Sequence, residues 1–127
     1  MSVSEVRDVA LFRYAPGDAV PKAVRDSVGK ILGETGGERL LPVDFRWERL
    51  SGDTFVELNR EQQTVVLNSK YREKILAGQS ASKTDAVVIK MLLFFLFHDE
   101  FDRKTSSGKY REWLGKINQS ILEAIPK

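Results

Sequence analysis

The chain has 127 residues and no cysteine, which excludes disulfide bonds, thiol catalysis and a zinc site with cysteine ligands. It has one histidine, His98, so a metal site of the common two-histidine type is also excluded. Residues 1–5 (MSVSE) carry neither the basic residues nor the apolar core of a signal peptide. These absences together predict a cytoplasmic protein.

Neither sign of charge dominates, because 20 Lys and Arg residues face 18 Asp and Glu residues. This balance does not by itself indicate a nucleic-acid partner, although residues 61–127 hold eleven basic and eight acidic residues. The chain also lacks a glycine-rich phosphate-binding loop and a Gly-x-Ser-x-Gly nucleophile motif. We therefore expect no enzymatic activity and no cofactor.

A length of 127 residues with 42% hydrophobic and 30% charged residues is typical of one globular domain, here 1–127. Residues 43–48 alternate between apolar and charged, which predicts a strand with one face on the core and one in water. Residue spacing and turn signals predict strands at 6–14, 43–50, 54–58 and 64–67, and helices at about 18–32, 69–76, 84–101 and 109–125. The expected fold is α+β: a small antiparallel sheet of three to four strands packed on a C-terminal helical hairpin, with an N-terminal helix.

The most informative segment is Ala86–Phe97, in which every residue except Lys90 is apolar. A helix that is apolar all round is expected to be buried on every side, in a core or against a partner. The segment is too short for a membrane span, which needs about 20 apolar residues. Ser82–Asp85 matches a capping box, so we expect the helix to begin there. The sheet and the last helix would cover it, completely or with a strip left for another protein.

The leading hypothesis is a non-enzymatic protein-interaction or assembly module that docks onto a partner or onto its own copy. The candidate interface residues are Val88, Lys90, Met91, Leu92, Phe95 and Trp113. For Lys90 we favour the interpretation that its ammonium group extends to the surface along a narrow polar stripe. Three others stay open: a buried lysine with a lowered pKa, an anchor for a substrate or phosphate, or a pair with a carboxylate across an interface.

A first alternative is nucleic-acid binding through the basic C-terminal half, with Tyr71, Tyr110 and Trp113 as neighbouring aromatic residues. Helical spacing places Tyr110 and Trp113 on the core face of the last helix, which argues against this alternative. The candidate residues are Lys70, Arg72, Lys74, Lys109, Arg111 and Lys116.

A second alternative is a small enzyme or metal site built on His98 and Asp102. Residues four apart share one face of an α-helix, so the two side chains would lie together. The competing interpretation is that residues 98–102 are the polar, solvent-facing end of the buried helix, and we favour it.

Residues 55–68 end in Leu67-Asn68 and are followed by Tyr71-Arg72 and then by the apolar helix. Over about 47–100 this arrangement resembles the region after the ATPase core in some bacterial GHKL-type ATPases (MutL- and gyrase-like) of defence operons. The chain lacks that family's ATP-binding motifs, so no catalytic residue is transferred. The resemblance implies an accessory or assembly module of such a system.

Overall fold

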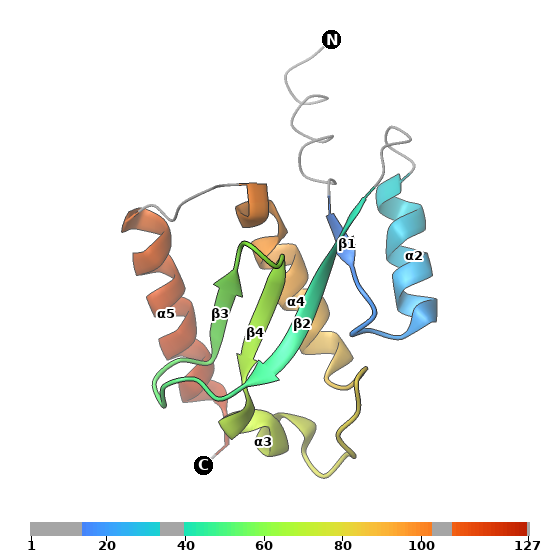
Figure 1. The fold of residues 1–127 in the computed structure, drawn as a ribbon. Helices are drawn as coiled ribbons and strands as arrows, with labels where there is room; N and C mark the ends of the chain where they lie inside the picture. Colours follow the sequence, from blue (N-terminus) through green and yellow to red (C-terminus); the bar gives the residue numbers. More distant parts are fainter. Residues whose placement is uncertain (1–13, 34–39, 103–107, 127) are drawn as a thin grey trace.

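The computed structural model describes residues 14–33, 40–102 and 108–126. A four-stranded sheet in the order β1-β2-β4-β3 lies at its centre (Figure 1). The elements in chain order are β1 (Tyr14–Pro16), α2 (Lys22–Gly33), β2 (Leu41–Glu48), β3 (Val56–Asn59), β4 (Thr64–Asn68), the 3₁₀ turn η1 (Ser69–Tyr71), α3 (Arg72–Leu76), α4 (Val87–Phe97), the 3₁₀ turn η2 (His98–Asp102) and α5 (Gly108–Ala124).

The predicted α+β class is confirmed, but the sheet is mixed rather than antiparallel. β1 pairs with β2 in parallel, because the chain crosses between them through α2. β3 and β4 form the predicted antiparallel hairpin, yet β4 and not β3 lies beside β2, and this pair is parallel. The alternation of residue types predicts that a strand exists, but it does not specify the neighbours of that strand.

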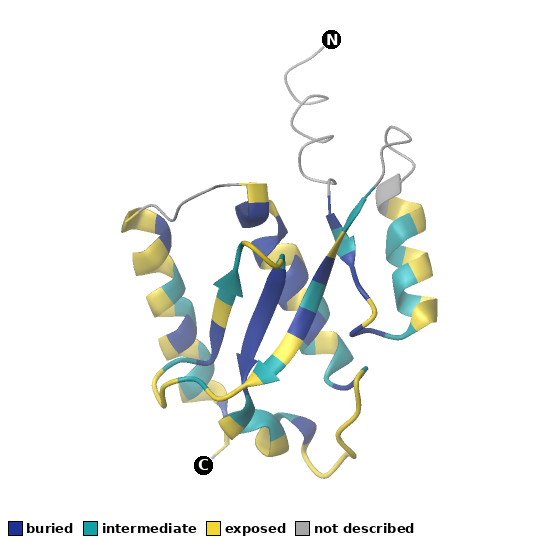
Figure 2. Ribbon diagram, in the orientation of Figure 1, coloured by how far each residue is buried: buried dark blue, intermediate teal, exposed yellow. Residues whose placement is uncertain are grey.

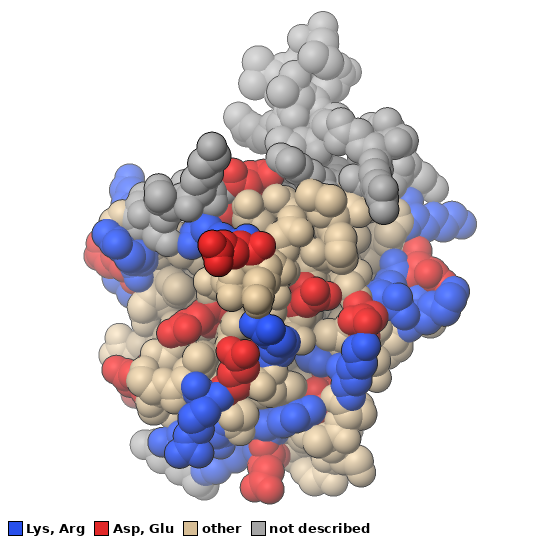
Figure 3. Space-filling view, viewed as in Figure 1, with Lys and Arg blue, Asp and Glu red and all other residues tan. Residues whose placement is uncertain are grey.

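The helices are placed around one face and the two edges of the sheet. Figure 1 shows α4 behind the sheet, α5 beside β3 and α2 beside β1. The other face of the sheet has no helix over it in this view. It carries charged residues of both signs, interspersed (Figure 3), and exposed and buried positions alternate along β2 (Figure 2). The prediction of one wet face holds along β2, whereas β4 is buried at all five of its positions.

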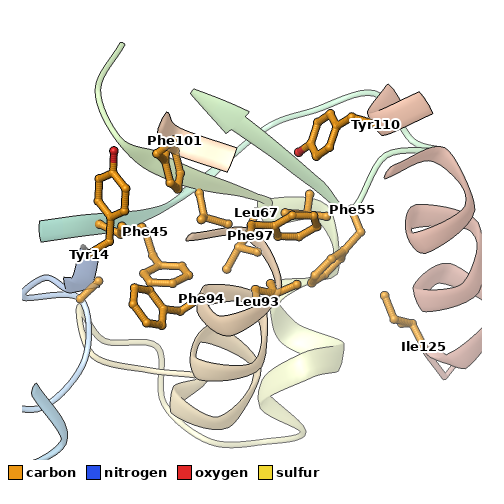
Figure 4. Close-up of a cluster of buried hydrophobic side chains, with 14 residues drawn as sticks. Tyr14, Phe45, Phe55, Leu67, Leu93, Phe94, Phe97, Phe101, Tyr110 and Ile125 are labelled. Carbon is orange, nitrogen blue, oxygen red and sulfur yellow. The ribbon is translucent and has the colours of Figure 1, made fainter. Parts of the chain in front are cut away.

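The core lies between the covered face of the sheet and α4. In Figure 4 the side chains of Phe94 and Phe97 of α4 lie in one cluster with those of Phe45 of β2 and Leu67 of β4. Each of these side chains is buried. Phe101 extends the core beyond the end of α4 and contacts the ring of Tyr14, with centroids 5.9 Å apart. Burial of aromatic side chains dominates the stability of such a core.

Two buried asparagines fix the irregular backbone around the hairpin. In α5, Asn118 accepts hydrogen bonds from the Phe55 and Val56 amides, both at 2.8 Å, and donates to the Val56 carbonyl at 3.1 Å. Asn68, at the end of β4, donates to the carbonyls of Ser51 (3.0 Å) and Thr54 (2.7 Å). Each side chain satisfies backbone groups that would otherwise be costly to bury.

Several predicted boundaries need correction. The segment 6–13 of the first predicted strand lies outside the described residues, and β1 continues through Pro16, where we expected a turn. The Asp85 carboxylate does accept from the Ser82 amide at 3.0 Å, as a capping box would require. However, Ala86 adopts a left-handed conformation (φ 50°), so α4 begins only at Val87.

The start of the first helix also differs from the prediction. Asp18, which we expected to cap that helix, instead pairs with Lys83 at 2.6 Å, and the helix α2 begins at Lys22.

The apolar helix is also shorter at its other end. α4 ends at Phe97, and the tighter turn η2 continues the chain to Asp102, where we expected α-helix to about Phe101. Among the described helices, none combines the length and the hydropathy needed to cross a membrane.

Candidate interaction surface

Lys90 lies on the inner face of α4 and is only 1% exposed. Its ammonium group donates to the carbonyls of Ala19 (2.9 Å) and Lys83 (3.2 Å), and lies 3.4 Å from the Asp85 carboxylate. The favoured prediction that this side chain extends to the surface is therefore wrong. Burial lowers the pKa of Lys90, and the neighbouring carboxylate of Asp85 opposes that shift.

Asp85 receives donors from three further segments. The Trp47 indole donates to one oxygen at 3.0 Å, while Arg72 (2.6 and 3.1 Å) and the Ser82 amide bond the other. Burial alone would raise the pKa of Asp85, but these donors and Lys90 outweigh it and leave the pKa lowered. Because the carboxylate and the ammonium group are both fully occupied, the cluster ties the fold together, and Lys90 has no donor to offer to a partner at the surface.

The opposite face of α4 is open to solvent. Val88 is 75% exposed, Leu92 66% and Phe95 51%. Their spacing of four and three residues places them in one row along the helix, here called the outer stripe. Met91 is half-buried beside it. The chain itself therefore does not bury the apolar helix on every side, because the sheet covers its inner face only.

A groove of about 800 Å³ runs beside the outer stripe, between α4 and α5. Leu92 and Leu96 form its α4 wall, and Trp113 lies on its α5 wall, where the indole ring meets Phe97 edge-on with centroids 5.9 Å apart. Trp113 was expected on the core face of the last helix but is 43% exposed. The charged residues that line this α4–α5 groove are Lys74 and Lys116.

The structure does not gather the six candidate nucleic-acid-binding residues into one cluster. Arg72 is engaged by Asp85, and its guanidinium lies over the Trp47 ring at 5.3 Å. Lys70 lies over the Tyr71 ring, and Lys74 and Lys116 flank the α4–α5 groove. Lys109 and Arg111 belong to the first turn of α5, at the opposite end of the molecule from α3 (Figure 1).

His98 is buried, and its ring stacks on Phe94 with centroids 5.3 Å apart. Burial lowers its pKa, and the charges of Asp99 and Asp102 oppose this effect. Its buried Nδ1 has no hydrogen-bond partner within the part of the chain that the structure describes. The Asp102 carboxylate instead accepts from the Tyr14 hydroxyl at 3.1 Å.

The predicted pairing of His98 with Asp102 assumed α-helical geometry, but both residues belong to η2. Residues four apart point about 40° apart on an α-helix but about 120° apart on a 3₁₀-helix. In the described ranges 14–33, 40–102 and 108–126, no group of three His, Asp or Glu side chains is arranged to hold a metal ion.

Residue spacing did not reveal the Asp85–Lys90 cluster, and it did not separate the outer stripe from the buried Lys90 among the candidate interface residues. In a run where almost every residue is apolar, there is no polar residue to mark the solvent side. The only charged residue of the run, Lys90, would ordinarily indicate the solvent-exposed face of the helix, but here it lies on the buried face.

Comparison with known proteins adds no assignment for this surface. No family model matches the chain, and neither a curated protein nor a solved structure gives a significant match.

Proposed function

We propose that this chain is a protein-interaction module that docks another protein chain through the outer stripe and the α4–α5 groove. One observation carries the proposal: Val88, Leu92 and Phe95 are exposed on the helix whose only charged residue is turned inward. The largest exposed apolar patch on a soluble protein is often its interaction site. Four of the six predicted interface residues lie on this surface as exposed side chains: Val88, Leu92, Phe95 and Trp113.

The fold gives little reason for apolar residues at 88 and 92, which are mostly exposed, whereas the Phe95 ring meets Phe94 edge-on with centroids 5.1 Å apart. The buried core residues of α4 are Leu93, Phe94 and Phe97, and Ile89 and Met91 are partly buried against the same core. Polar residues at 88 and 92 would serve a solvent-facing helix at least as well, because large exposed apolar side chains promote aggregation. A partner that covers them supplies the missing reason.

We propose a bacterial cytoplasmic assembly as the setting, in which the chain is an accessory component of a GHKL-type ATPase or defence system. Two residues of that resemblance, Asn68 and Arg72, have structural roles in this fold. Asn68 orders the loop 51–54, and Arg72 binds Asp85 just before α4 begins. If such an ATPase is the partner, Leu92→Asp should prevent its co-purification. A complex that survives this substitution would place the ATPase elsewhere on the chain.

The interaction itself is tested by a photo-activated cross-linking residue placed at Phe95, with the same residue at Glu57 as a control. Glu57 is exposed on the wet face of the sheet, away from α4. We expect a discrete protein adduct from position 95, lost when Leu92→Asp is added, and no adduct from position 57. An adduct yield at position 95 no greater than at position 57 would overturn the proposal.

A further inference from the structure

We infer that the chain covering this surface is a second copy of the same protein, related by a twofold axis that passes close to Leu92. This inference rests on the proposed function and names its partner. In the dimer, the outer stripe of each copy inserts into the α4–α5 groove of the other.

The shape of the surface supports a symmetric pairing. A twofold interface must be self-complementary, so that a feature on one copy meets its counterpart on the other. The outer stripe is a ridge, and the α4–α5 groove lies directly beside it, with Leu92 belonging to both. Two such surfaces interlock ridge into groove, as neighbouring helices do.

The exposed apolar area is sufficient for a dimer interface. Five exposed side chains, namely Val88, Leu92, Phe95, Leu96 and Trp113, supply on the order of 500 Å² of apolar surface, within the range of the largest patches on monomers. Two copies together bring about 1,000 Å². A standard interface buries about 1,200–2,000 Å² in total, with somewhat more than half of it apolar.

Charge is consistent with the same arrangement. Near a twofold axis each residue lies opposite the same residue of the other copy. A charged residue at the centre of the interface would therefore meet a like charge. The outer stripe has none, because Lys90 is the only charged residue of α4 and is bonded to Asp85 inside. The lysines of the groove, Lys74 and Lys116, are exposed and can keep their ammonium groups in water at the rim.

Sedimentation velocity of the purified full chain between about 1 and 300 µM tests the inference. We expect a reversible monomer–dimer equilibrium, with the dissociation constant raised at least about 30-fold by Leu92→Asp, as for a central hot-spot residue. Glu57→Lys should leave it unchanged. A wild-type chain that stays monomeric throughout would overturn the inference. In that case an adduct of Phe95 with a different protein would still support the proposed function, and the absence of any adduct would remove both.

The absence of cysteine allows a second test of the geometry. Leu92→Cys places the only thiol of the chain next to the axis, where two Cα atoms can approach within the roughly 4.4–6.8 Å that a disulfide requires. We expect mild oxidation to give a covalent dimer with Leu92→Cys and none with Glu57→Cys. Equal yields from the two variants would contradict the proposed axis.

Discussion

Both faces of α4 carry large apolar side chains, but the two faces have opposite environments. The inner face carries Phe94 and Phe97 against the sheet, together with the buried charge of Lys90. The outer face carries Val88 and Leu92 with most of their surface in water. In an ordinary surface helix, the charged residue lies outside and the apolar residues lie inside.

This reversal separates what the fold requires from what it does not. The inner lysine is tolerated because Asp85 and the carbonyls of Ala19 and Lys83 satisfy its ammonium group. Nothing in the described chain gives a comparable reason for the exposed leucine and valine. Because the fold does not require apolar side chains at Val88 and Leu92, we explain them by a role in binding.

The largest effect should come from breaking the inner cluster. Asp85→Ala leaves Lys90 buried without its carboxylate, and it also removes the acceptor of Arg72 and Trp47. We expect the free energy of unfolding in urea to fall by about 3–5 kcal/mol. Asp18→Ala is the matched control, because its salt bridge with Lys83 is exposed and should matter little. If the two substitutions lowered the free energy of unfolding equally, the Asp85–Lys90 cluster would not stabilise the fold more than an exposed salt bridge does.

Adjacent leucines on α4 allow the most direct comparison of the two faces. Leu93 is 3% exposed and Leu92 is 66% exposed. At protein concentrations where only monomer is present, Leu93→Ala should cost about 2–5 kcal/mol. Leu92→Ala should change stability by no more than about 0.5 kcal/mol. A large loss from Leu92→Ala in the monomer would mean that the outer face belongs to the core.

The groove depends on α5 staying docked, and Asn118 holds it to β3. Asn118→Ala leaves the amides of Phe55 and Val56 without their acceptor, so we expect a loss of about 2 kcal/mol in urea unfolding. The next residue, Gln119, carries the same amide group but is exposed, so Gln119→Ala is the control and should be nearly neutral. Stability unchanged by Asn118→Ala would argue against this anchor.

A smaller effect concerns His98 at the end of α4. Its pKa in the folded chain lies below 6.5, so between that value and 6.5 the unfolded chain binds a proton that the folded chain does not. Stability should therefore fall as the pH drops below about 6.5, with a slope of at most about 1.4 kcal/mol per pH unit.

The substitution His98→Phe keeps an aromatic ring against Phe94 and removes the titrating group. We expect it to flatten the pH dependence of unfolding between pH 7.5 and 5.5. The same slope in both proteins would assign the pH dependence to another group.

Much of the fold follows from local patterns, and much of the surface does not. The alternation in residues 43–48, the β3–β4 hairpin and α5 were predictable because each depends on neighbouring residues in the sequence. The parallel pairing of β2 with β4 and the Asp85–Lys90 contact depend on segments brought together only by folding. The left-handed Ala86, which delays the start of α4, has no glycine to signal it.

The candidate site divides in the same way. Val88, Leu92 and Phe95 were predicted as interface residues, and the structure places them on the surface. Lys90 was placed with them because a charged residue usually lies on the polar side of a helix. Its actual position depends on Ala19 and Asp85, and no spacing rule within the helix contains that information.

The most direct test of the proposed dimer is the urea midpoint of unfolding measured over about a hundredfold range of protein concentration, for the wild type and Leu92→Asp. A protein whose folded form dimerises is stabilised as its concentration rises. We predict that the wild-type midpoint rises with concentration. The Leu92→Asp midpoint should stay constant at the value that the wild type has when dilute. Constant midpoints in both proteins would contradict the dimer, and a Leu92→Asp midpoint far below that of the dilute wild type would show that Leu92 belongs to the core.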